Sequence, residues 1–152
     1  MRNIVLLFPG QGSQVPGMGK DLADGFEAAR DVFAAADDVL GFRLSQLCFD
    51  GPADQLMLTM NAQPALLAHG AAVWAVVRDR IGGSVVAAAG HSLGEFTAYH
   101  SADALALPEA VALVRMRGEL MFAEGAARPG GMAAILGDMD ISGDELDRKS
   151  VV

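Results

Sequence analysis

The sequence is poor in cysteine, aromatic residues and positive charge. Cys48 is its only cysteine, so no intrachain disulfide can form, and a reducing, cytoplasmic location is expected. Aromatic residues make up only 6% of the chain, so its core must consist mainly of Ala, Val, Leu and Met. The 152 residues carry a formal net charge of −8. This charge argues against nucleic acid as a partner, because nucleic-acid binding needs a basic face.

Long hydrophobic runs are also lacking. Apolar residues 4–8 are too few for the apolar segment of a secretion signal, and Pro9-Gly10 follows them at once. The Ala- and Val-rich stretches are interrupted by Trp74 and by charged residues 78–80, well short of a membrane span. Neither secretion nor membrane insertion is therefore expected. The length suits one domain or part of a larger one.

The sequence is rich in small and apolar residues, and the spacing of the apolar residues predicts an α/β fold. Residues 4–8 read as a fully buried strand of a parallel sheet, and residues 85–89 and 130–137 as further strands. Helical spacing predicts one helix over residues 18–40 that ends at Gly41. Further helices are expected over residues 44–48, 54–58, 59–81 and 107–124, and another is expected to start near Leu93. Pro64 is expected in the first turn of the long helix over residues 59–81.

The motif around which the chain is organised is Gly-x-Ser-x-Gly at residues 90–94. Placed between a strand and a helix, this pattern predicts a nucleophile elbow, in which a strained turn exposes the serine hydroxyl. Gly90 and Gly94 let neighbouring backbone pass without a Cβ clash, and the helix N-terminus favours a developing oxyanion. Ser92 is therefore the candidate nucleophile. The alternative is a glycine-flanked turn in an Ala-rich core.

Two further features indicate a site. Residues 9–19 contain four glycines and two glutamines directly after the first strand, without the spacing of a nucleotide-binding loop. We interpret them as a site loop, with a flexible surface turn as the alternative. Arg117 lies on an apolar helix face, whereas Arg115 and Glu119 are spaced for an ion pair on the solvent side. A buried unpaired charge is costly, so Arg117 needs an anion, a wet pocket, or a structural partner such as Glu124.

Together these features resemble the malonyl-CoA:acyl carrier protein transacylases. The resemblance covers residues 1–146 and rests on four motifs in matching order. These are residues 8–14 (Phe-Pro-Gly-Gln-Gly-Ser-Gln), 63–66 (Gln-Pro-Ala-Leu), 90–95 (Gly-His-Ser-Leu-Gly-Glu) and 117–118 (Arg-Gly). Four motifs in one order are far more specific than a lone Gly-x-Ser-x-Gly.

The resemblance implies a role for each matching residue. Ser92 is the acyl-accepting nucleophile, and the backbone amides of Gln11 and Leu93 form the oxyanion hole. Arg117 pairs with the malonyl carboxylate, which supplies the missing anion. Gln63 lines the pocket near that arginine. His91, beside the nucleophile, is expected to shape the substrate pocket.

The resemblance also implies a ping-pong reaction of fatty acid biosynthesis, without cofactor or metal. Malonyl passes from CoA to serine and then to the phosphopantetheine thiol of acyl carrier protein, in an enzyme that is monomeric when full length. The family's catalytic histidine lies beyond the end of this chain, and His69, His91 and His100 are not placed to replace it. We therefore expect an incomplete, nearly inactive chain.

The implied fold is an α/β-hydrolase-like large subdomain with a parallel sheet over residues 1–127. Residues 128–146 are expected to begin a ferredoxin-like small subdomain. Residues 147–152 fit neither a helix end nor a domain terminus and are expected to be a non-native tail.

Three alternatives remain open. The chain could derive from the acyltransferase domain of a polyketide synthase or multifunctional fatty acid synthase. It could be a serine esterase of the α/β-hydrolase class, although such an enzyme needs no carboxylate-binding arginine. It could also be a non-catalytic module that docks a carrier protein.

Overall fold

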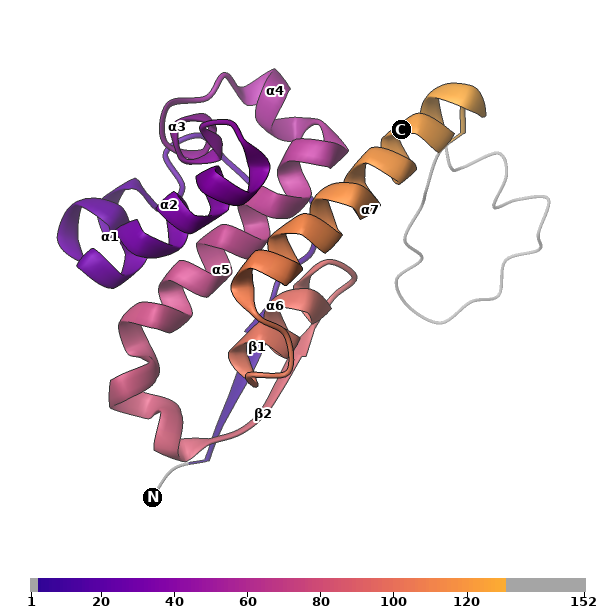
Figure 1. Ribbon diagram of the computed structural model, residues 1–152. Helices are drawn as coiled ribbons and strands as arrows, with labels where there is room; N and C mark the ends of the chain where they lie inside the picture. Colours follow the sequence, from indigo (N-terminus) through magenta and orange to yellow (C-terminus); the bar gives the residue numbers. More distant parts are fainter. Residues whose placement is uncertain (1–2, 131–152) are drawn as a thin grey trace, which may run out of the picture. The chain divides into compact units, whose positions relative to one another are not determined.

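The computed structural model describes residues 3–130, which form a mixed α/β arrangement (Figure 1). In chain order its elements are β1 (Ile4–Phe8), α1 (Lys20–Gly25), α2 (Glu27–Leu40), α3 (Leu44–Asp50), α4 (Ala53–Met57), α5 (Thr59–Ile81), η1 (Gly82–Ser84), β2 (Val85–Gly90), α6 (Gly94–Ser101) and α7 (Leu107–Ala127). The chain divides into two compact units, Met1–Phe122 and Ala123–Val152. The predicted strand at residues 130–137, most of the expected small subdomain at 128–146 and the tail at 147–152 lie outside the described residues.

The two described strands pair in parallel, as predicted, with Leu6 opposite Ala88 and Phe8 opposite Gly90. The expectation that the first strand is fully buried is wrong, because Val5 is 53% and Leu7 76% exposed. Alternate side chains of a strand point to opposite faces of the sheet. The described helices cover the face to which Leu6 and Phe8 belong and leave the other face open.

The core lies among the helices and between them and the sheet. Helix α2 runs along α5, and α6 packs against both strands and against α5 (Figure 1). The largest apolar side chains with almost no exposure are Phe33, Leu44, Leu56, Leu67, Leu93, Val111 and Val114. Cys48 is buried among them, as predicted. The motif residue Leu93 therefore fixes the turn that holds Ser92 to the core.

The single helix predicted over residues 18–40 is wrong, because the chain forms α1 and α2 with Phe26 between them. Phe26 has extended backbone angles (φ −135°, ψ 126°), and Gly25 just before it weakens helix continuation. Arg30 Nη1 donates a hydrogen bond to the Ala23 carbonyl at 2.8 Å, which satisfies the end of α1. The predicted stop at Gly41 is confirmed by its left-handed conformation, with φ 70°.

Pro64 does not lie in the first turn of its helix, as had been expected. Helix α5 begins at Thr59, so Pro64 falls in the second turn. Proline has no backbone N–H, so the carbonyl of Met60, four residues earlier, loses its intrahelical donor. Arg115 Nη1 donates to that carbonyl at 3.0 Å. A side chain of α7 thus satisfies a backbone group of α5.

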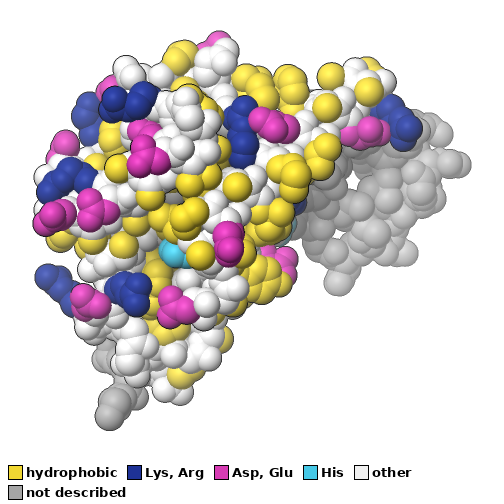
Figure 2. All heavy atoms as spheres, in the orientation of Figure 1, with side chains coloured by type: hydrophobic (Ala, Val, Ile, Leu, Met, Phe, Trp, Pro, Cys, Tyr) yellow, Lys and Arg dark blue, Asp and Glu magenta, His cyan; other side chains and the backbone are white. Residues whose placement is uncertain are grey.

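The face of the molecule shown in Figure 2 carries charges of both signs. On the face shown in Figure 2, basic and acidic side chains are interspersed, in keeping with the ion pairs Lys20–Asp50 and Arg43–Asp37. Within residues 3–130, no helix is both long and apolar enough to cross a bilayer.

Candidate active site

Ser92 lies in the turn between β2 and α6, where the sequence predicts a nucleophile elbow. Its backbone φ is 53°, in the left-handed region that residues other than glycine rarely adopt. The turn is fixed on both sides: the His91 N–H donates to the Phe8 carbonyl at 3.1 Å, and the Gly94 N–H to the His91 carbonyl at 2.9 Å. Backbone strain of this kind is typical of functional sites.

The two glycines of the motif are required by close backbone approach. A Cβ on Gly90 would lie 1.9 Å from the carbonyl carbon of Gly94, and a Cβ on Gly94 would lie 2.2 Å from the carbonyl oxygen of Phe8. Both distances are far below any allowed contact. The glycines therefore let the first turn of α6 rest directly on the ends of both strands.

The loop after β1 packs against this turn. A Cβ on Gly10 would lie 2.6 Å from Nδ1 of His91, so the imidazole fills the space next to Gly10. Gln11 Nε2 donates to Thr59 Oγ1 at 3.0 Å, which attaches the loop to the start of α5. Within residues 3–130, the backbone N–H groups of Gln11 and Leu93 have no hydrogen-bond acceptor. Both are therefore free to donate to an oxyanion.

Arg117 of α7 reaches the nucleophile directly. Its Nη2 donates to Ser92 Oγ at 3.0 Å, and its Nη1 donates to Gln63 Oε1 at 2.6 Å. Its Cζ lies 5.8 Å from the centre of the Phe96 ring, a cation–π distance. The structure thus brings together three predicted site residues from two helices and one turn: Gln63 of α5, Arg117 of α7 and Ser92.

Gln63 is fully buried and holds Arg117 through its amide oxygen. Its Nε2 donates to Met121 Sδ at 3.3 Å, so both ends of the amide are engaged. In the described part of the chain no carboxylate pairs with Arg117; Glu124, the alternative partner, pairs with Arg128 at 3.1 Å. The guanidinium therefore has a neutral partner, and its charge is free for a bound anion.

The helix that carries Arg117 was predicted only in part. The Arg115–Glu119 ion pair is confirmed, with Nε and Oε1 2.6 Å apart. The apolar face around Arg117 is only partly buried: Leu120 is 65% exposed, whereas Gly118 is buried. A Cβ on Gly118 would lie 2.8 Å from the Met60 Cα, so α7 meets the start of α5 at this glycine. Sequence reasoning missed this contact, although Gly118 stands in a motif.

None of the three histidines, all within residues 3–130, forms a hydrogen bond with Ser92 Oγ. His100 Nδ1 lies 3.1 Å from the Leu105 carbonyl oxygen. Burial lowers the pKa of His69, which favours its neutral form, and the nearby Asp21 opposes this shift. His91 packs on Gly10. Arg117 is the hydrogen-bond partner of Ser92 Oγ among residues 3–130, so this part of the chain presents no general base to the serine.

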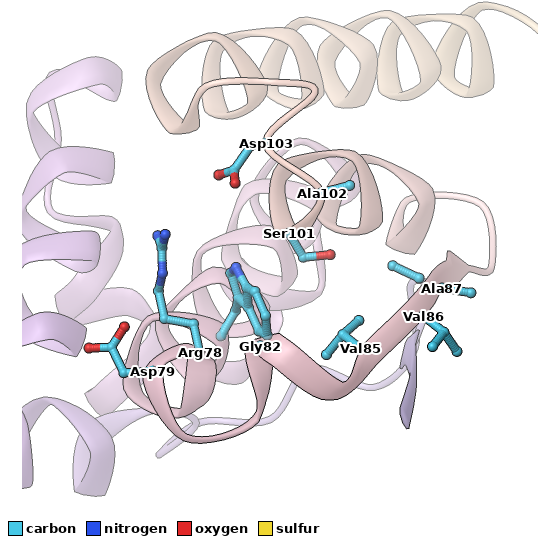
Figure 3. Close-up of a pocket in the computed structure, with 11 residues that line it drawn as sticks. Arg78, Asp79, Gly82, Val85, Val86, Ala87, Ser101, Ala102 and Asp103 are labelled. Atoms are coloured by element: carbon cyan, nitrogen blue, oxygen red, sulfur yellow. The ribbon is translucent and has the colours of Figure 1, made fainter. Parts of the chain in front are cut away.

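Two cavities lie along β2, away from the Ser92–Arg117 pair. One of about 460 Å³ is bounded by the end of α5, by Val85–Ala87 and by Ser101–Asp103, as Figure 3 shows. The other, of about 430 Å³, is lined by residues of β2 and α6, including Glu95 and Tyr99. Ser101 Oγ donates to the Ala98 carbonyl at 2.8 Å and so is not poised as a second nucleophile. In residues 3–130, no three His, Cys, Asp or Glu side chains cluster as a metal site.

Comparison with known proteins places this geometry in a family context. A family model described as acyl transferase domain matches residues 5–145. A malonyl CoA-acyl carrier protein transacylase of Bacillus subtilis (strain 168) is 49% identical over 137 residues, covering 90% of this chain and 43% of that protein. The polyketide biosynthesis protein ThaF of Burkholderia thailandensis is 44% identical over 131 residues, covering 86% of this chain and 11% of that protein.

Solved structures agree with the fold. An acyl-carrier-protein-S-malonyltransferase from Bartonella henselae superimposes with a TM-score of 0.76 at 47% identity, covering 81% of this chain and 40% of that one. A malonyl-transacylase in complex with a type II polyketide synthase acyl-carrier protein gives 0.77 at 43% identity, covering 85% and 41%. The chain thus spans less than half the length of these relatives.

Proposed function

The chain belongs to the acyl transferase domain family, and we propose that it carries the acyl-accepting half of a malonyl transacylase site. The observation that supports this most is the contact between Ser92 and Arg117. A serine in a strained turn lies within hydrogen-bond distance of a guanidinium that no carboxylate of residues 3–130 neutralises. A malonyl thioester has both features that such a pair can use, an acyl carbonyl and a free carboxylate.

In the proposed reaction, Ser92 Oγ attacks the thioester carbonyl of malonyl-CoA. The Oγ–carbon bond forms and the carbon–sulfur bond breaks, while a base accepts the serine proton and passes it to the departing CoA sulfur, so that CoA leaves as the thiol. The backbone N–H groups of Gln11 and Leu93 stabilise the negative charge on the carbonyl oxygen by hydrogen bonds. The phosphopantetheine thiol of acyl carrier protein then attacks the serine ester and restores the hydroxyl. Residues 3–130 bring no base to Ser92, and we assign that role to the remainder of a full-length enzyme.

Arg117 is proposed to recognise the acyl group. In a malonyl ester of Ser92, the carboxylate carbon lies three bonds from Oγ, and Nη2 already lies 3.0 Å from that oxygen. Gln63 holds Nη1 and leaves Nη2 free to move from the hydroxyl to the carboxylate. A charge-assisted bond of this kind contributes about 1.5–3 kcal/mol, so an acetyl group, which lacks the carboxylate, should be disfavoured.

The same proposal covers the partner, the substrates, the fold and the oligomeric state of the full-length enzyme. The partner is acyl carrier protein, which is supported by the similar malonyl-transacylase solved with such a protein. The reaction needs no cofactor beyond its two substrates, the malonyl-CoA thioester and the phosphopantetheine thiol of the carrier protein. The described α/β unit is part of an α/β-hydrolase-like subdomain, in an enzyme that serves fatty acid biosynthesis and is monomeric when full length.

Labelling of Ser92 tests the proposal. The chain is incubated with malonyl-CoA or acetyl-CoA, and the acylated residue is identified by peptide mass spectrometry. We expect slow malonylation of Ser92, slower acetylation, and no label in a Ser92→Ala variant. Labelling that is equally fast with both thioesters, or that falls on other residues, would contradict the proposal. Faster turnover of p-nitrophenyl acetate than of malonyl-CoA would favour a serine esterase instead.

The similarity to ThaF supports a second candidate, the acyltransferase of a polyketide pathway. The chemistry at Ser92 is the same, but the acceptor differs. Transfer of malonyl to a polyketide carrier protein in preference to a fatty acid carrier protein, measured with the full-length enzyme, would favour it.

A further inference from the structure

Arg115 occupies an unusual position between three parts of the fold. Its Nη1 donates to the Met60 carbonyl at 3.0 Å and to Asn61 Oδ1 at 2.8 Å, both at the start of α5. Its Nε pairs with Glu119 on its own helix, and its Cζ lies 5.3 Å from the centre of the Phe42 ring, before α3. A surface ion pair needs none of the contacts beyond Glu119.

The bond to Met60 has a cause in the sequence. Pro64 removes the N–H that would otherwise bond to the Met60 carbonyl, so this carbonyl needs another donor. Asn61, the neighbouring acceptor, is itself held, since its Nδ2 donates to the Gln55 carbonyl at 2.9 Å. Arg115 therefore docks on a fixed pair of acceptors, and one of them, the Met60 carbonyl, is available because of Pro64.

This docking point lies beside the candidate active site. Gly118, three residues after Arg115, touches Met60 so closely that a Cβ would lie 2.8 Å from its Cα. Arg117, between these two residues, reaches Gln63 on the same helix α5. A shift of α7 along α5 at Met60 would therefore move the Arg117 guanidinium away from both Gln63 and Ser92.

We propose that Arg115 is a positioning residue, which fixes α7 on the Pro64-opened turn of α5 so that Arg117 reaches Gln63 and Ser92. The placement of Arg117 is independent of any reaction. The consequence for malonyl selectivity rests on the proposed function. A measurement on the Arg117 side chain tests the first claim, and a measurement of malonyl selectivity tests the second.

The first measurement follows Arg117 itself, by the ¹⁵N and ¹H NMR signal of its Nε–H group. Gln63→Ala supplies the reference for an Arg117 that has lost its support. In Arg115→Ala we expect the Arg117 signal to move toward this reference. Arg128→Ala, which breaks an i,i+4 ion pair between Glu124 of α7 and the residue just after that helix, should leave the signal in place. An unmoved signal in Arg115→Ala would overturn the inference whatever the chain's activity.

A double-mutant cycle tests the link to Pro64. Pro64→Ala restores an N–H that can bond to the Met60 carbonyl. The factor by which Arg115→Ala lowers the equilibrium constant for folding should therefore be about ten times smaller in the Pro64→Ala background than in the wild type. The measurement is urea unfolding of the four variants. Equal losses in both backgrounds would contradict the role given to the Met60 carbonyl. If Arg115→Ala does not fold, Arg115→Lys, which keeps the charge but not the fork, takes its place, with a smaller expected loss.

The second measurement is the ratio of malonyl to acetyl labelling at Ser92. We expect Arg115→Ala to lower the ratio several-fold and Glu119→Gln, which removes only the ion pair, to leave it unchanged. No preference in the wild-type chain would count against the proposed function alone. A wild-type preference that Arg117→Ala abolishes and Arg115→Ala retains would refute the positioning role.

Discussion

Arg117 Nη2 and Ser92 Oγ lie 3.0 Å apart, although 25 residues separate them in the chain. The contact joins a strained turn at the end of the sheet to helix α7, which also packs on the start of α5 at Met60. Because Gln63 supports the other guanidinium nitrogen, the arginine is held in place before any substrate arrives. Such preorganisation is what a carboxylate-binding site requires.

Gln63→Glu is a sharp test of that arrangement. The new carboxylate has almost the same shape as the amide and should pair with Arg117, so the variant should fold at least as stably at pH 7. The pair would neutralise the guanidinium, and the preference of Ser92 for malonyl over acetyl should fall about tenfold. Urea unfolding and competitive labelling measure the two effects. A variant that keeps its malonyl preference would show that Arg117 does not need its free charge.

Gly90→Ala should unfold the chain or destabilise it by about 3 kcal/mol or more. The added methyl would lie 1.9 Å from the Gly94 carbonyl carbon, which is backbone and cannot move aside without displacing α6. Gly125→Ala, in α7, is the matched control, because no other atom of residues 3–130 lies within 4 Å of its Cβ position. This control should be neutral or stabilising by about 0.5–1 kcal/mol. Circular dichroism during urea unfolding distinguishes the variants, and similar stabilities would argue against the tight elbow.

Cys48 should make the protein less stable at high pH. Burial raises the pKa of its thiol from 9.0 to about 12, with Asp37 adding to the shift. The thiol in the unfolded chain ionises above pH 9 while the folded one keeps its proton, so stability is lost as the pH rises from 9 to 12. Between pH 9 and 10 the wild type should lose about 1 kcal/mol more than Cys48→Ala. Equal losses would show that the thiol is solvated in the folded state.

The sequence predicts the elbow well because its requirements are local. Gly90, Ser92 and Gly94 lie within five residues, and the strain and close approach that they show follow from the turn itself. The proximity of Arg117 to the serine came only from the family resemblance. A helical wheel placed Arg117 on an apolar face but could not say which residue lies across from it.

The exposed face of β1 and the second role of Arg115 were not predicted, because both depend on contacts between segments that are distant in the sequence. Leu7 is exposed because strand burial depends on how many layers cover the sheet, which residues 4–8 cannot specify. The second role of Arg115 depends on a carbonyl freed by Pro64, 51 positions away by residue number. Both residues of that pair were noted in the sequence, but separately. Only the fold connects them.

The central claim is that Ser92 and Arg117 form one site for a thioester that ends in a carboxylate. Equilibrium binding of malonyl-CoA and acetyl-CoA to the chain, measured by calorimetry with wild type and Arg117→Ala, tests it without requiring a catalytic base. We predict that the wild type binds malonyl-CoA about tenfold more tightly than acetyl-CoA and that Arg117→Ala binds both equally. Equal affinity of the wild type for the two thioesters, or a preference that survives Arg117→Ala, would contradict the account.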